Sequence, residues 1–136
     1  KSPLMLACQY GNFEMIQYLI ARGANVNLPD KEGMTALMLA VENHHLLIVH
    51  FLLNHGADAT IKNNNEQTAL DLAAEKNFLA IFSCIAHSKD FSQVELINVL
   101  AKYPKMNILF AKQNKTLVST FNSPTFQTKG LLDLVD

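Results

Sequence analysis

Three residues near the middle of the chain have side chains that could carry out nucleophilic catalysis. Cys84, His87 and Asp90 follow one another at steps of three, which would offer a thiol, an imidazole base and a carboxylate. A catalytic set is usually assembled from distant segments, however, and these three would lie on the end of one helix. Cys84 also occupies an apolar helix position. We therefore expect core and surface residues here, and we do not expect this segment to be an enzyme.

A second group that could do chemistry consists of histidines, which are common metal ligands: His44, His45, His50 and His55. Their spacing argues against a metal site, because residues five apart, such as His50 and His55, do not stack on one helix face. The sequence also contains no glycine-rich phosphate loop and no paired-cysteine zinc motif. It therefore predicts no metal, no cofactor and no small-molecule substrate.

The composition limits the class of protein further. With 136 residues, 49% of them hydrophobic, the chain can form one compact unit or a short array. A net charge of −1 argues against nucleic acid or a membrane surface as partner, because phosphate binding needs clustered Lys and Arg. The two cysteines, Cys8 and Cys84, are expected to be buried free thiols in a reducing compartment. We therefore expect a cytoplasmic protein, with the nucleus or a host-cell cytosol as alternatives.

The elements that position these residues recur with a step of 33 residues. The segment Ser2–Ala7 returns as Thr35–Ala40 and again as Thr68–Ala73. A second block keeps the same step, because Gly23–Asn25 returns as Gly56–Asp58. Such a period is typical of a repeat architecture, in which a binding surface is expected before an active site.

One period predicts two helices followed by a loop. Thr35 can cap a short inner helix through its hydroxyl, and His44 lies at the turn where a left-handed conformation is needed. Residues 46–53 form an apolar second helix, which Gly56 can end. The polar residues 58–67 are then expected to leave the helices as an extended loop.

The order Thr-x-Leu-x-x-Ala, turn, apolar helix and Gly-Ala-Asp resembles the ankyrin repeat. The resemblance covers residues 2 to about 85, and residues 1–85 would hold three repeats. It implies an all-α solenoid of stacked antiparallel helix pairs with projecting β-hairpin loops. The sequence departs from the family where the usual histidine is replaced and where the hairpin glycine, kept at Gly33, becomes Glu66. The residues in place of the histidine are Met5, Met38 and Asp71.

Residues 86–136 fit this pattern less well. Phe91–Tyr103 predicts an amphipathic helix ended by Pro104, and 119–130 reads as loop or turn. The motif 132–134 echoes Leu70-Asp71-Leu72, so we expect a divergent helical repeat and the start of a further one, packed on the same stack. The apolar face of the predicted helix would consist of Val94, Ile97 and Leu100.

The resemblance implies that a partner protein lies against the loop tips and the inner helices. The tip candidates are Lys31, Glu32, Met34, Asn64, Asn65 and Gln67. The inner-helix candidates are Met5, Gln9, Tyr10, Met38, Glu42, Asn43, Asp71, Glu75 and Lys76. We expect Met5 and Met38 to point into the groove rather than to be buried, and Tyr10 to be the best anchor. Acidic candidates outnumber basic ones, which favours a partner with a partly basic surface.

These patterns favour a protein–protein interaction module, a scaffold or adaptor that binds its partner on the concave face and loop tips. One alternative is a targeting array of a larger enzyme or secreted bacterial effector whose catalytic domain lies outside this fragment. Another is a structural spacer that has no partner of its own. A spacer is distinguished from a binding module by capture experiments, because it should recover nothing in a saturable way.

Overall fold

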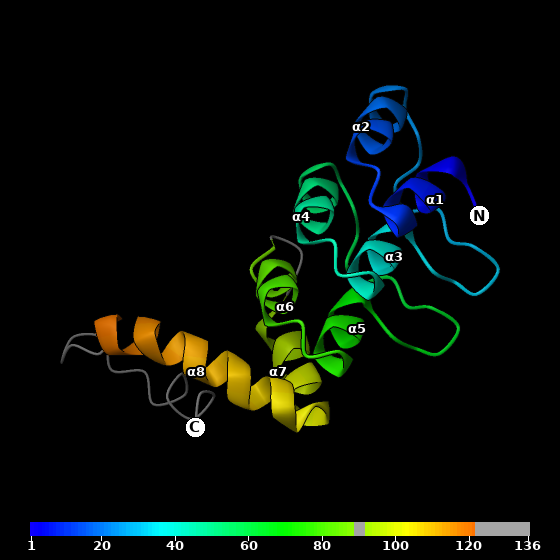
Figure 1. The fold of residues 1–136 in the computed structure, drawn as a ribbon. Helices are drawn as coiled ribbons and strands as arrows, with labels where there is room; N and C mark the ends of the chain where they lie inside the picture. The colour runs from blue at the N-terminus through cyan, green and yellow to red at the C-terminus, as the bar shows by residue number, and fades with distance from the viewer. Residues whose placement is uncertain (89–91, 122–136) are drawn as a thin grey trace.

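The computed structural model describes residues 1–88 and 92–121, which contain α-helices and no strand. Figure 1 shows α1, α3 and α5 in one row and α2, α4 and α6 in a second row, with two loops projecting beside the first. This arrangement confirms the predicted all-α solenoid of stacked helix pairs. The helix bounds are α1 Pro3–Tyr10, α2 Phe13–Ala21, α3 Ala36–Glu42, α4 Leu46–Asn54, α5 Ala69–Glu75, α6 Leu79–Ala86, α7 Gln93–Lys102 and α8 Pro104–Phe121.

The inner helices α1, α3 and α5 begin and pack alike because their sequences repeat. Each starts after a hydroxyl residue whose side chain accepts a hydrogen bond from the backbone N–H three residues later. The caps are Ser2, Thr35 and Thr68. Each helix also buries an alanine at the same place, which allows neighbouring helices to approach closely. These alanines are Ala7, Ala40 and Ala73.

The turn between the two helices of each repeat requires a left-handed residue. Gly11, His44 and Asn77 occupy this place with φ of 78°, 60° and 59°, which confirms the expectation for His44. The His44 ring also stacks on Phe78 of the next repeat, with centroids 4.1 Å apart. The strained turn residue therefore helps to join two repeats.

The two projecting loops are hairpin-shaped although neither contains a strand in the described residues. Backbone hydrogen bonds close each loop. The Asp30 N–H donates to the Met34 carbonyl at 2.9 Å in the first loop, and the Asn63 N–H donates to the Gln67 carbonyl at 2.9 Å in the second. The loops also bind each other, because the Asn64 N–H donates to the Glu32 carbonyl at 2.9 Å. They therefore form one connected unit rather than two separate flaps.

Gly33 lies where these two loops meet, and we expect its replacement by alanine to destabilise the array. Its φ is 78°, and an added Cβ would lie 2.9 Å from the Asn63 Cα and from the Asn64 nitrogen. Gly56 is the matched control, because it has a similar φ of 91° but open space around the same position. Gly33→Ala should lower the free energy of unfolding by about 1–3 kcal/mol more than Gly56→Ala. Urea unfolding measures both, and equal costs would contradict the contact between the loops.

The C-terminal helices α7 and α8 pack against α5 and α6, with two differences from expectation. Ser92 caps α7 and Pro104 begins α8, so the predicted helix and its end are confirmed. The predicted apolar face is confirmed for Leu100, which is buried, but is wrong for Val94 and Ile97, which are exposed, because α7 packs through Val99 beside Leu100. Residues 119–121 belong to α8 rather than to a loop, while 122–130 and the motif 132–134 lie outside the described residues.

One hydrophobic core runs through the whole stack and extends into α7 and α8. In α8, Met106 and Phe110 are buried, and the Phe110 ring lies edge-on to Phe82 of α6 with centroids 5.2 Å apart. α8 therefore packs against the outer helix of the third repeat. Among the described helices, none has both the length and the apolar character needed to cross a membrane.

Candidate partner-binding site

The candidate residues that remain accessible fall into two rows, one on the inner helices and one on the loops. One row lies at the ends of the inner helices, at positions 33 residues apart: Gln9 and Tyr10, Glu42 and Asn43, Glu75 and Lys76. The other lies at the loops: Lys31, Glu32, Asn64, Asn65 and Gln67. A hydrogen bond of 2.8 Å from the Gln67 amide to the Glu75 carboxylate links the two rows. We call this surface the inner face.

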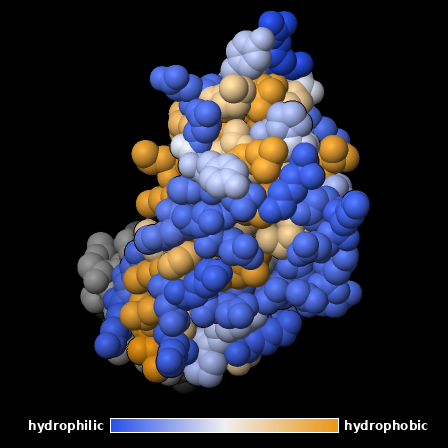
Figure 2. Space-filling view, turned by 45° about the vertical axis from the view of Figure 1, so that its right-hand side comes forward, coloured by the Kyte–Doolittle hydropathy of each residue, from blue (hydrophilic) through white to orange (hydrophobic). Residues whose placement is uncertain are grey.

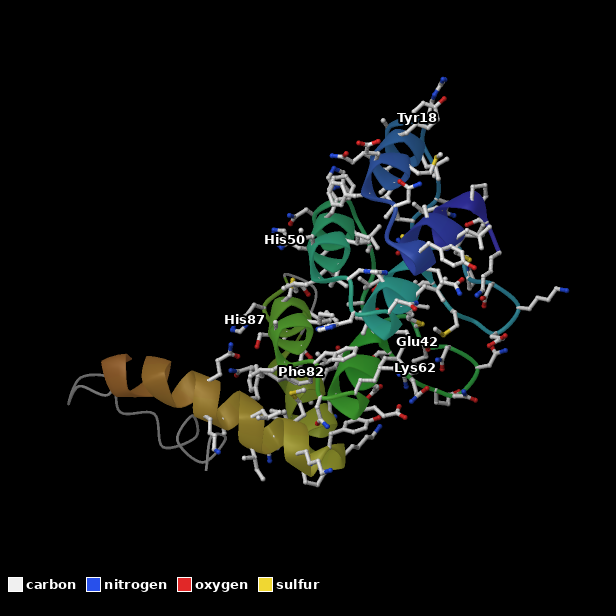
Figure 3. All side chains as sticks on the ribbon, viewed as in Figure 1. Tyr18, Glu42, His50, Lys62, Phe82 and His87 are labelled. Carbon is white, nitrogen blue, oxygen red and sulfur yellow. The ribbon has the colours of Figure 1, made fainter. Side chains whose placement is uncertain are left out.

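The pictures place the inner face away from the outer helices. In Figure 3, Glu42 and Lys62 lie on the side from which the loops project, whereas Tyr18, His50 and His87 lie along α2, α4 and α6. Figure 2 brings the loop side forward and shows a mainly hydrophilic surface. Polar and charged contacts are therefore what this side offers to a partner.

The inner face is held rigid by hydrogen bonds to backbone atoms. The Asn43 amide donates to the Leu39 carbonyl at 2.8 Å, and the Asn64 amide donates to the Lys31 carbonyl at 2.9 Å. The Asn27 side-chain amide joins the first loop segment to the second: it donates to the Gly56 carbonyl at 3.0 Å and accepts from the Asp58 N–H at 2.8 Å. A surface already ordered before binding loses less conformational entropy when a partner docks.

Tyr10 is the largest accessible side chain of the inner face. It is 77% exposed, and within the described residues its hydroxyl has no hydrogen-bond partner. Tyr18 on the outer face is less available, because Arg22 donates to its hydroxyl at 2.8 Å and also lies over its ring. The structure is therefore compatible with Tyr10 as an anchor, which remains a prediction.

The expectation that Met5 and Met38 project into the groove is wrong. Their exposed fractions are 2% and 1%, because α1 packs against α2 and α3, and α3 packs against α1, α4 and α5. Met34, expected at a loop tip, is also buried, and its sulfur accepts a hydrogen bond from the Asn63 amide at 3.4 Å. These methionines belong to the core and offer no area to a partner in this conformation.

Asp71 was also predicted to contact a partner, and this prediction is wrong because its side chain is buried, with only 5% exposed. Its Oδ2 accepts from the Thr68 backbone N–H at 2.9 Å and from the Thr68 hydroxyl at 3.1 Å. The Thr68 hydroxyl in turn accepts from the Asp71 N–H, which completes a capping box. The spacing Thr68-x-x-Asp71 was the sequence signal for this structural role.

Tyr103 is a residue of this region that the sequence reasoning missed. It follows α7 at the end of the inner row. Burial raises the pKa of its phenol, the negative charges of Asp71 and Glu75 raise it further, and a polar contact with Gln67 lowers it in part. The end of α7 therefore lies in a negative potential set up by α5.

This potential leads to a prediction for the variant Asp71→Asn. Removing the carboxylate charge should lower the pKa of Tyr103, because a nearby negative charge disfavours the phenolate. The change can be measured by ultraviolet titration in a Tyr10→Phe, Tyr18→Phe background, in which Tyr103 is the remaining tyrosine. Glu42→Gln is the control and should leave the titration unchanged. An unaltered Tyr103 pKa in the Asp71 variant would contradict the effect of the Asp71 carboxylate on Tyr103.

The described members of the candidate catalytic set, Cys84 and His87, each approach a different partner. The Cys84 sulfur lies 3.8 Å from His50 Nδ1 on α4, whereas His87 Nδ1 is bound to the Ser83 carbonyl, and Asp90 lies outside the described residues. Burial raises the pKa of Cys84, and it raises the pKa of Cys8 to about 12, so neither thiol is activated. In the described part of the chain, no three His, Cys, Asp or Glu side chains could hold a metal ion.

The fold and the site together define an array of helical repeats with projecting loops and no assembled catalytic group among the described residues. A family model of ankyrin repeats in three copies matches residues 4–108. Because the match spans more than half of the chain, the protein belongs to the ankyrin repeat family. Among curated proteins, no sequence matches this chain. Ankyrin repeats are in general protein–protein interaction modules and are typically non-catalytic.

Proposed function

We propose that this array is a scaffold or adaptor that binds another protein along its inner face. The observation that carries the proposal is the pair of exposed rows, which recur with the 33-residue step on rigid elements. Exposed side chains at repeating positions present a partner with one continuous surface instead of isolated contacts. The buried side chains at repeating positions form the hydrophobic core, so their recurrence reflects folding and not partner binding.

The charge of the inner face suggests what the partner offers. Its accessible acids are Glu32, Glu42 and Glu75, against Lys31 and Lys76. Three carboxylates against two ammonium groups leave a small negative excess on the inner face. The negative charge of Asp71, which raises the pKa of the neighbouring Tyr103, adds to this excess at the end of α7. A partner surface with some Lys or Arg is therefore favoured over an acidic one.

Capture from a cell lysate with matched variants tests this proposal. The wild-type chain is compared with an inner-face variant, Tyr10→Ala, Glu42→Lys and Glu75→Lys, in which all three altered side chains are exposed. The captured proteins should be lost from the inner-face variant by at least about tenfold, since each altered contact or reversed charge costs binding free energy. Competition with untagged wild-type chain shows that capture is saturable.

An outer-face variant is the control for that experiment. Tyr18→Ala, Leu47→Ala and His50→Ala replace exposed residues of α2 and α4 and should leave capture unchanged. Loss of capture in this control and not in the inner-face variant would move the binding surface to the outer helices. The absence of any saturable capture would favour a structural spacer.

A further inference from the structure

Apolar residues at the α1–α2 end of the stack are exposed, although their equivalents in the later repeats are buried. Leu6 of α1 is 43% exposed, whereas Leu39 and Leu72, one and two steps of 33 residues later, are 3% and 5% exposed. The outer helices show the same difference. Met15 of α2 is exposed, and the residues at its position in α4 and α6 are buried. These buried residues are Ile48 and Ile81.

The missing neighbour of the first repeat accounts for this difference. The pair α3–α4 lies between the pairs α1–α2 and α5–α6, with α3 packed against both α1 and α5 (Figure 1). Among the described helices, α1 and α2 have a following pair but no preceding one. Leu6 and Met15 therefore occupy positions that a preceding pair covers. We call these two residues the N-terminal end face.

The start of α7 can be aligned with the start of the earlier inner helices. Ser92 caps α7 as Thr68 caps α5, because each side chain accepts a hydrogen bond from the backbone N–H three residues later. Counted from these caps, Val94 takes the position of Leu70. Ile97 takes the position of the buried alanines that the three inner helices share.

Val94 and Ile97 are exposed, although every earlier inner helix buries these two positions. Leu4, Leu37 and Leu70 are all buried at the position of Val94. Leu4 is buried without a preceding pair among the described helices, so α2 and the following pair cover it. α7 has α8 beside it but, in the described part of the chain, no following pair. Val94 and Ile97 therefore occupy positions that a following pair covers, and we call them the C-terminal end face.

We propose that copies of this chain stack head to tail, with the C-terminal end face of one copy on the N-terminal end face of the next. The contact continues the interface between neighbouring repeats, in which each helix pair covers apolar positions of the next. Each end face lacks the neighbour that the other supplies, which favours this orientation over the pairing of two identical ends. The proposal goes beyond the proposed function, because none of the four residues belongs to the inner face.

Sedimentation velocity of the whole chain tests whether copies associate. Each copy has one end face of each kind, so a head-to-tail contact can continue beyond a dimer. The weight-average mass should rise with concentration over roughly 10 µM to 1 mM, the range expected for a small interface. A chain that stays monomeric over this whole range would overturn the proposal.

Complementation between two variants tests the orientation. Leu6→Lys with Met15→Lys charges the N-terminal end face, and Val94→Lys with Ile97→Lys charges the C-terminal one; all four residues are exposed, so the fold should persist. Each variant alone should be monomeric, because burying an unpaired ammonium in an apolar contact is costly. An equal mixture should form a dimer and stop there, because each copy contributes one intact end face.

Leu46→Lys with Leu47→Lys is the control, because it adds the same charge at exposed apolar residues of α4 outside both end faces. This variant should associate like the wild type. Self-association of either end-face variant alone, or a mixture of the two that stays monomeric, would contradict head-to-tail stacking. If a double variant fails to fold, the single substitutions Met15→Lys and Val94→Lys replace it, since these side chains are 44% and 67% exposed.

Discussion

Replacing Phe82 by alanine is expected to lower the free energy of unfolding by about 3–5 kcal/mol. Phe82 is fully buried in α6, and its ring makes the edge-on contact with Phe110 of α8. The variant leaves a cavity and also loses the aromatic contact that fastens α8 to the stack. Because repeats are stabilised by their nearest neighbours, α8 should unfold at lower urea than the remaining helices. Far-ultraviolet circular dichroism during urea unfolding measures both effects.

Leu47→Ala is the matched control for this measurement. Leu47 lies on α4, also an outer helix, but is 75% exposed, so its loss should change stability by no more than about 0.5 kcal/mol. Phe82→Leu, which keeps an apolar side chain, should fall between the two. A Phe82→Ala variant as stable as Leu47→Ala would contradict the packing of α8 against α6.

Replacing Met38 by alanine is expected to cost about 2–5 kcal/mol of unfolding free energy. Met38 is 1% exposed in α3, the inner helix of the central repeat, which packs against α1, α4 and α5. Its loss therefore affects the middle of the stack, where neighbours on both sides depend on it. Thermal or urea unfolding of the single variant gives the value directly.

Tyr10→Ala is the control for Met38, because both residues belong to inner helices but Tyr10 is 77% exposed. We expect Tyr10→Ala to leave stability nearly unchanged and to weaken partner capture. Weaker capture by Met38→Ala would report a destabilised array and not a lost contact. A Met38 variant of normal stability that fails to capture the partner would instead place Met38 on the binding surface.

Much of the fold could be predicted from residues that act locally. The caps at Thr35 and Thr68 and the turn at His44 depend on a few neighbouring backbone atoms, so their spacing alone indicates helix, turn and helix. Ser92 and Pro104 likewise define the bounds of α7 through local geometry. The 33-residue step then orders these units, because equal units bury equal faces against each other.

The faces of individual helices were harder to predict, because burial depends on which neighbour covers them. Met38 and Glu42 are four residues apart in α3 and so lie on the same side of the helix, and only the packed neighbours show that Met38 is in the core while Glu42 is exposed. Val94 and Ile97 have apolar helical spacing, yet α7 turns another face to α5 and α8. The repeat pattern could not supply this orientation because the short link after α6 departs from it.

The candidate site was predictable to a similar extent. Tyr10, Glu42 and Glu75 follow from the repeat positions at the ends of the inner helices, and the structure leaves them exposed. A cavity of about 190 Å³ beside Asp71 was not predictable, because residues far apart in the sequence line it, Thr60 and Lys62 of the second loop and Val99 of α7 among them. Its one local signal, the Thr68-x-x-Asp71 capping box, indicates the buried carboxylate but not the space beside it.

Hydrogen–deuterium exchange of the chain, alone and with its captured partner, tests most directly whether the inner face binds. We expect slower exchange on complex formation at loop residues 30–34 and 63–67 and at the ends of α1, α3 and α5. The helices α2 and α4 should exchange as they do in the free chain. Protection confined to α2, α4 and α6, with unchanged exchange in the loops, would contradict binding on the inner face.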